Sequence, residues 1–336
     1  MAYHHRAIRD ERPACHASTN SMLNSRGWWP EGVAVLRMLV FLLLAIGTYP
    51  AGAQTAHSLG DVPDVLKTPE GRQTFAQEIE GKPAPDGLGV RLPARLSAQQ
   101  IAALLVPAAD KTPPSLVGAK PLPGQADTYV AIVCTSDDRR GTPDAPVCDQ
   151  SDFGTPRPDM KTYVGIIEAK DGAAPRLLAG PALVDGKVDW RDTNLKEAPS
   201  VDDGDRGRMR PQTFDGFDLA PYEIAPGHRA FGLRAGWSEG YAGGGASFGA
   251  LYLFAVVDGA LKQILAVPMS FSKNIAGEWH KDGTRDHDIS EGANVLIVTT
   301  DRTDGYFDLQ LRSRTDNSRR LLKWSAATSD YQFAGK

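Results

Sequence analysis

Residues 251–268 read LYLFAVVDGALKQILAVP, and this stretch decides the fold class. Two apolar runs lie on either side of Asp258-Gly259, a dipeptide that favours a tight two-residue hairpin turn. From Tyr129 onward, short runs of the same kind recur between Gly-rich and Asp-Gly segments. No stretch there shows convincing helical periodicity. The sequence therefore predicts a mostly β fold, with antiparallel hairpins that form a β-sandwich or two adjacent β modules.

Upstream of these runs, the chain is rich in Pro, Ala and Gly and has only two helical patterns. Thr68 followed by Pro69 is typical of a helix N-cap and first turn. Ser97 with Gln100 forms a capping-box pattern that predicts a second short helix. We expect an irregular, Pro-rich arm with one or two short helices.

Four segments follow from these shifts in composition. Residues 1–53 are expected to be an N-terminal extension with a cleaved signal peptide, and residues 54–126 the Pro/Ala-rich arm. A first β unit with a disulfide is expected over 127–205, and a second β unit over 206–336.

A signal peptide is indicated by the apolar run MLVFLLLAI at 38–46. Arg26 and Arg37 precede it, and the small residues Ala51 and Ala53 occupy the positions that a signal peptidase reads. The run is about half of the ~20 residues that a membrane-spanning helix needs. We therefore expect cleavage near Ala53, a periplasmic or extracellular location, and no permanent membrane span afterwards.

The cysteines agree with export. Of the three in the chain, Cys15 lies in the extension, which leaves Cys134 and Cys148 as a pair. In an oxidising compartment such a pair is normally a disulfide. Closing the 15-residue loop from Cys134 to Cys148 contributes about 3 kcal/mol to stability.

The charge balance excludes one class of partner. The chain has 37 basic and 41 acidic side chains and a net charge of -4. Nucleic-acid-binding proteins concentrate basic residues in a patch or stripe, so we expect no nucleic-acid partner.

Two serines lie in G-x-S-x-G patterns, GWSEG at 236–240 and GASFG at 245–249. In serine hydrolases this motif is a strand-to-helix turn. Here Ser247 is followed by the strand pattern of 251–257. The simpler interpretation is that 240–249 is a glycine-rich surface loop between two strands.

The densest group of polar residues is EWHKDGTRDHDISEG at 278–292, which we expect to be a loop. Imidazole together with carboxylate is the ligand chemistry of Zn²⁺ and similar ions, whereas carboxylates alone suit Ca²⁺. A solvated turn remains the alternative. The candidate metal ligands are His280, Asp282, Asp286, His287 and Asp288.

The segment Asp301–Asp308 is similar in its last residues to a calcium-binding loop. However, Arg302 stands at one ligand position, and a cation there argues against calcium. A hairpin turn at Asp304-Gly305 explains the same residues.

Aromatic side chains are candidates for binding another molecule, because Trp and Tyr contribute much of the affinity of protein interfaces. The alternative is that each closes the edge of a core. The candidates near the two polar segments are Trp237, Tyr241, Phe248 and Trp279.

No complete catalytic set or cofactor motif emerges from these patterns, and no cofactor is expected apart from a possible divalent metal. The leading hypothesis is an exported, non-catalytic binding protein, such as an inhibitor, an immunity-type protector or an envelope complex subunit. Its partner would be another exported or envelope protein. The alternatives are a metal-dependent hydrolase that uses the His280–Asp288 loop, and a calcium-stabilised envelope structural protein.

Overall fold

The computed structural model describes residues 54–137, 147–152, 155–157, 159–191, 193–200 and 207–335. The predicted signal peptide lies outside this range. Strands dominate the described residues, which confirms the predicted fold class. The helical elements are a short 3-10 turn at Leu59–Asp61 and the helices α2 (Val62–Val65), α3 (Pro69–Glu78) and α4 (Ala98–Leu105). Within the described part of the chain, no helix is long and apolar enough to cross a membrane.

A large antiparallel sheet contains most of the second half of the chain. Its strand order is β18-β17-β16-β15-β14-β13-β12-β11-β4, and β1 pairs with β15 in addition. The strands are β1 (Gln54–Ala56), β4 (Cys148–Asp149), β11 (Thr213–Ala225), β12 (His228–Tyr241), β13 (Gly244–Val257), β14 (Ala260–Trp279), β15 (Arg285–Thr303), β16 (Tyr306–Ser313), β17 (Arg319–Ser325) and β18 (Asp330–Phe333).

A second sheet has the order β2-β3-β7-β8, again antiparallel. Two short pairs, β5 with β6 and β9 with β10, complete the strands. Their bounds are β2 (Pro114–Pro121), β3 (Thr128–Thr135), β5 (Ser151–Asp152), β6 (Thr155–Pro156), β7 (Lys161–Glu168), β8 (Arg176–Leu183), β9 (Val188–Asp189) and β10 (Arg208–Met209).

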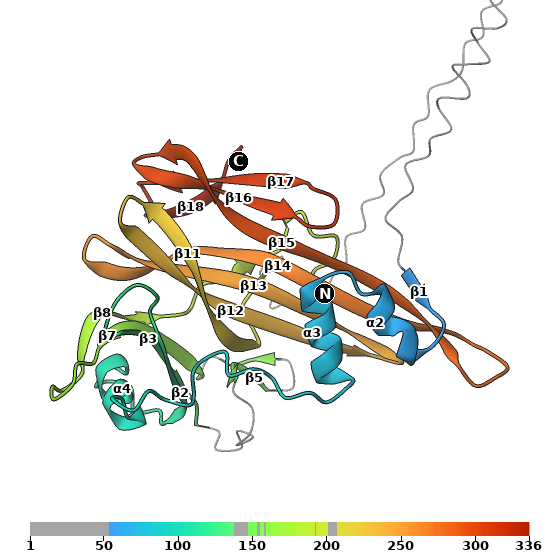
Figure 1. Cartoon of the computed structure of the whole chain (residues 1–336), viewed down its shortest axis with the longest axis horizontal. Coiled ribbons are helices and arrows are strands. Elements are labelled where there is room, and N and C mark those ends of the chain that lie inside the picture. Colours follow the sequence, from blue (N-terminus) through green and yellow to red (C-terminus); the bar gives the residue numbers. More distant parts are fainter. Residues whose placement is uncertain are drawn as a thin grey trace, which may run out of the picture. The chain divides into compact units, whose positions relative to one another are not determined.

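The main core lies between the two sheets. Side chains alternate across β3, so that Val130 and Ile132 face the large sheet while Ala131 and Val133 pack with α4. Both sets are fully buried, which explains why this strand reads as one continuous apolar run. A helix therefore covers the outer face of the small sheet, and the large sheet covers its inner face (Figure 1).

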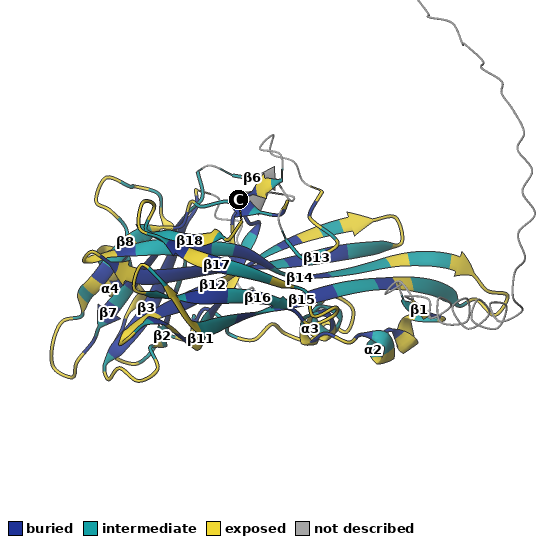
Figure 2. Ribbon diagram, turned by 90° about the horizontal axis from the view of Figure 1, so that it is seen from above, coloured by how far each residue is buried: buried dark blue, intermediate teal, exposed yellow. Residues whose placement is uncertain are grey.

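The large sheet curls, so that its C-terminal strands pack back onto its own middle strands. A second core forms there from side chains of β11–β15 and of β16–β18. Trp324 belongs to this core, stacked on Tyr306 with a centroid distance of 3.8 Å and packed edge-on against Tyr331. The middle strands thus carry one core on each face, and Figure 2 shows buried residues along them and exposed residues at the hairpin ends.

Hairpin turns form where Asp-Gly dipeptides predict them. Asp258 and Gly259 have φ values of 52° and 78°, and Asp304 and Gly305 have 50° and 86°. Positive φ at both central residues is the geometry of a two-residue hairpin turn. The segment 301–308 is therefore the β15–β16 hairpin.

Two segments that were expected to be loops are strands. β12 continues to Tyr241 and β13 begins at Gly244, so only two residues of the 240–249 segment form a turn. Likewise, much of 278–292 belongs to β15, which begins at Arg285. Pairing with neighbouring strands provides hydrogen-bond partners for the backbone amides and carbonyls of these polar and Gly-rich residues. This pairing outweighs their weak intrinsic preference for β structure.

The disulfide between Cys134 and Cys148 is confirmed, with a Cα separation of 6.0 Å. It links β3 of the small sheet to β4 at the edge of the large sheet. Strand pairing also crosses the expected segment boundaries: β1 and β2 come from the Pro-rich arm, and β4 pairs with β11. The sheets are therefore assembled from non-contiguous pieces of the chain.

Candidate functional site

The paired ends of β14 and β15 form a hairpin that extends beyond the neighbouring strands in both Figure 1 and Figure 2. We call residues 270–293 the distal hairpin. It holds most of the polar residues singled out in the sequence. The N-terminal strand β1 pairs with its β15 side, so that Thr55 lies opposite Asp288 and Ala56 opposite His287.

Strand register brings three potential metal ligands together. Because Ala56 lies opposite His287, the next residue along β1, His57, lies beside Asp286. A bulge in β14 between Ala276 and Trp279 then leads into the turn that holds His280. The turn is closed by the His280 amide, which donates to the Thr284 carbonyl at 2.8 Å.

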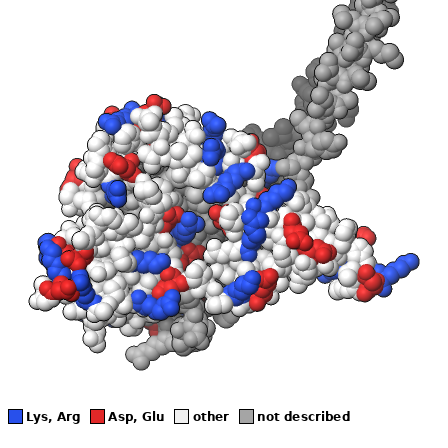
Figure 3. Space-filling view, viewed as in Figure 1, with Lys and Arg blue, Asp and Glu red and all other residues white. Residues whose placement is uncertain are grey.

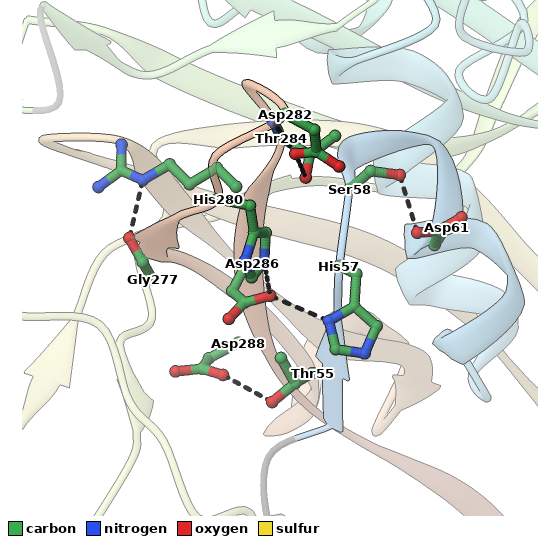
Figure 4. Close-up of polar contacts among 11 residues, drawn as sticks. Thr55, His57, Ser58, Asp61, Gly277, His280, Asp282, Thr284, Asp286 and Asp288 are labelled. Atoms are coloured by element: carbon green, nitrogen blue, oxygen red, sulfur yellow. Dashed lines mark hydrogen bonds and ion pairs between the residues drawn. The ribbon is translucent and has the colours of Figure 1, made fainter.

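The geometry of this group is compact (Figure 4). The Oδ1 atom of Asp286 lies 3.1 Å from Nδ1 of His57 and 2.7 Å from Nε2 of His280. One nitrogen of each ring and the carboxylate oxygen all lie within 4.8 Å of one another. We call these three residues the His-Asp cluster. Two imidazoles and one carboxylate are a ligand set that transition-metal ions accept.

The cluster is open to solvent. The His57 side chain is 81% exposed and that of His280 38%, while Asp286 retains 25% of its side-chain exposure. The hydrogen bond from His280, and a second from His57, hold the pKa of Asp286 below its usual value. Asp286 is therefore an anionic ligand at neutral pH.

The other predicted metal ligands point elsewhere. Asp282 accepts hydrogen bonds from the amide and the hydroxyl of Thr284, at 3.0 and 2.7 Å. These bonds lower the pKa of Asp282 and close the turn at the tip of the hairpin.

His287 and Asp288 are also separate from the cluster. Alternation along β15 turns His287 to the opposite face, where its Nδ1 lies 3.0 Å from Oδ1 of Asn274. Asp288 accepts a hydrogen bond of 2.9 Å from the Thr55 hydroxyl. Of the five predicted ligands, the structure brings together His280 and Asp286, and it adds His57 from the start of the described chain.

The four candidate aromatics divide by burial. Trp237 and Phe248 are only 3% and 4% exposed, and both rings pack edge-on against Trp190. The indole of Trp237 donates to the Arg210 carbonyl at 2.8 Å. These two side chains belong to the main core and offer no surface to a partner.

The other two aromatics are exposed. Trp279 is 70% exposed and packs against the guanidinium of Arg285, with 5.2 Å between that group and the ring centroid. Tyr241 is 38% exposed, and its hydroxyl is hydrogen-bonded to Glu239. Tyr241 lies opposite Gly244, and Gly244 lies opposite Ile275, which is 43% exposed.

The two G-x-S-x-G serines are inside strands. Ser238 lies on β12 and Ser247 opposite it on β13, where neither forms a strand-to-helix turn. The Ser247 hydroxyl instead lies 3.2 Å from that of Thr74 on α3. The arrangement lacks the sharp turn that exposes a hydrolase nucleophile.

Charged side chains of both signs are interspersed over the face in Figure 3. That mixture agrees with the small net charge of -4. No known family model matches the chain, and comparisons with curated proteins and with solved structures found no significant match.

Proposed function

We propose that this chain is an exported, non-catalytic binding protein that contacts another exported or envelope protein through the distal hairpin. The observation that carries the proposal is Trp279, a large aromatic side chain that is 70% exposed at the end of a projecting hairpin. Tryptophan is among the residues most enriched at the energetic centres of protein interfaces. A partner that covers this ring removes from water an apolar surface that is exposed in the isolated chain, and this burial favours association.

An exposed apolar pair near the hairpin extends the proposed contact region to the other face of the sheet. Ile275 pairs with Asp288, whereas Trp279 pairs with Arg285, which lies on the opposite face. Tyr241 and Ile275 lie on one face of the sheet, with Gly244 between them in the register. Because glycine has no side chain, nothing on β13 separates the two exposed side chains at this row. The Nζ atom of Lys273 lies 5.7 Å from the centroid of the Tyr241 ring. This charged group gives the pair a polar border of the kind found at interface rims.

Export is supported by the apolar N-terminal run with its small-residue cleavage pattern, and by the disulfide between Cys134 and Cys148. A projecting convex hairpin suits a macromolecular partner better than a small molecule, because small ligands bind in concave sites.

Site-specific photo-crosslinking tests the proposal. A photoreactive amino acid is placed at 275 or 279 in cells that export the protein with its own leader. Leu178 and Val256, each 40% exposed on other strands, serve as matched control positions. We expect a discrete adduct with an exported protein from positions 275 and 279, and none from 178 or 256.

Purified Trp279→Ala protein then provides the affinity measurement. We expect the identified partner to bind this variant at least tenfold more weakly, because loss of an interface anchor costs about 2 kcal/mol or more. Adducts from all four positions alike, adducts from none, or unchanged affinity of the variant would each contradict the proposal.

A further inference from the structure

We propose that His57, His280 and Asp286 bind a divalent transition-metal ion of the Zn²⁺ class, which ties the N-terminal strand β1 to the distal hairpin. This site is independent of the proposed protein partner. It rests on two imidazoles and a carboxylate that converge from two segments of the chain, 229 positions apart between His57 and Asp286.

Two of the three distances between ligand atoms are close to those that a metal requires, and the two ring nitrogens lie within 4.8 Å of each other. Around a tetrahedral zinc ion with bonds of about 2.0–2.1 Å, ligand atoms lie roughly 3.3 Å apart. The Asp286 oxygen is 3.1 Å from His57 Nδ1 and 2.7 Å from His280 Nε2. Since both rings are solvent-exposed, small rotations are enough to open these hydrogen bonds around an ion.

The ligand types select the class of ion. Neutral imidazole binds Zn²⁺, Cu²⁺ and Ni²⁺ well, whereas Ca²⁺ and Mg²⁺ prefer shells made of oxygen atoms. With a single carboxylate, the cluster offers few oxygens to the latter ions. Three protein ligands also leave a coordination position for water or for another molecule.

The location of His57 gives the ion a structural effect. β1 is three residues long and is joined to β15 through only three register pairs. An ion bound by both His57 and the hairpin would put coordinate bonds directly after these pairs, in place of the hydrogen bond between His57 and Asp286. Ion binding should therefore reduce the opening of the N-terminal strand, because whatever binds only the closed form stabilises it.

Isothermal titration with Zn²⁺ tests the site on the mature, disulfide-bonded protein, purified without a polyhistidine tag. We expect one ion per chain, with no binding of Ca²⁺ or Mg²⁺ at the same concentrations. His57→Ala, His280→Ala and Asp286→Asn should each weaken Zn²⁺ binding at least tenfold.

The matched controls are His287→Ala and Asp288→Asn. Both residues lie one or two positions from Asp286, yet the first faces the opposite side of the sheet and the second bonds to Thr55. We expect both variants to bind Zn²⁺ within twofold of the unchanged protein. Circular dichroism checks that all five variants keep the β fold.

Hydrogen exchange of residues 54–57 provides a second readout. Zn²⁺ should slow exchange there in the unchanged protein but not in His280→Ala, whose substitution leaves the β1–β15 pairs in place. Equal loss of binding in the control and cluster variants, no saturable binding, or zinc binding without slower exchange would each overturn the proposal.

Discussion

Trp237 on β12 and Trp279 at the end of β14 belong to the same sheet, yet one is 3% and the other 70% exposed. Replacing Trp237 by Ala removes a ring packed against Trp190 and leaves a cavity in the main core. We expect this change to lower the free energy of unfolding by about 3–5 kcal/mol. The free energy of unfolding of Trp279→Ala should stay within about 0.5 kcal/mol of the wild-type value, because a surface substitution loses little packing.

Urea denaturation of the two variants measures this contrast. Similar losses of stability in both would mean that Trp279 is part of the folded core, and the surface proposed for a partner would then have to be abandoned.

Asp110 and Tyr163 form a buried polar pair that anchors the loop after α4 to the small sheet. The Tyr163 hydroxyl donates to Oδ2 of Asp110 at 2.7 Å, and the Asp110 side chain is 6% exposed. This hydrogen bond is the main reason that the pKa of Asp110 lies far below its usual value. In turn, burial, followed by the contact with Asp110, raises the pKa of Tyr163 to about 12.

A pH dependence of stability follows from this pair. Because the pKa of Asp110 is lower in the folded state, its contribution is present above the unfolded value of about 3.9 and is lost as the pH falls below it. Tyr163→Phe removes the main cause of the shift. We therefore expect urea denaturation between pH 5 and pH 2 to show a smaller loss of stability in this variant than in the unchanged protein. An equal or larger loss in the variant would contradict this assignment.

At the scale of elements, α3 is held on the sheet through its N-terminus. The Glu291 carboxylate on β15 accepts hydrogen bonds from the amide of Lys67, and from the amide and hydroxyl of Thr68 at 3.0 and 2.8 Å. The Thr68 hydroxyl also accepts from the Gly71 amide at 3.0 Å, which caps the helix. One strand carboxylate thereby orients the entry into α3.

Glu291→Ala should loosen α3 without unfolding the sheets. We expect a local loss of about 1–3 kcal/mol, because backbone donors at the helix start lose their partner. Hydrogen exchange should become faster across 67–78, while exchange in β13 stays unchanged. Glu291→Gln keeps an acceptor oxygen and should have a smaller effect; equal effects of the two variants would show that charge, and not hydrogen bonding, holds the helix.

At the scale of the whole molecule, the large sheet is shared by two cores. Tyr252 packs in the main core, whereas Leu251 and Leu253 on the same strand pack in the second core. Because both cores pack against the same middle strands, disrupting these strands would expose the side chains of both cores. The disulfide adds a covalent link between the sheets.

We therefore expect the described part of the chain to unfold in a single cooperative transition. Calorimetric and van't Hoff enthalpies should agree, and tryptophan fluorescence should coincide with far-UV circular dichroism. Two separate transitions would instead indicate that the expected units 127–205 and 206–336 fold independently, despite the strand pairs that join them.

Short-range patterns were enough to predict the strand-rich fold, both helix starts and the hairpin turns. The Ser97 and Gln100 side chains form the expected capping box, and Thr68 caps α3 as its position predicts. These features depend on residues only a few positions apart, so their energetics are contained in the local sequence. The even cysteine pair likewise predicted the disulfide that joins the sheets.

Tertiary structure alone decided which side chains meet and which are covered. His57 reaches Asp286 because β1 pairs in one register with β15, and a shift by one residue would turn His57 to the other face. Trp237 is buried because Trp190 and other side chains of the main core cover it, while nothing among the described residues covers most of Trp279. Register and burial result from packing summed over residues far apart in the chain, and no local pattern records that sum.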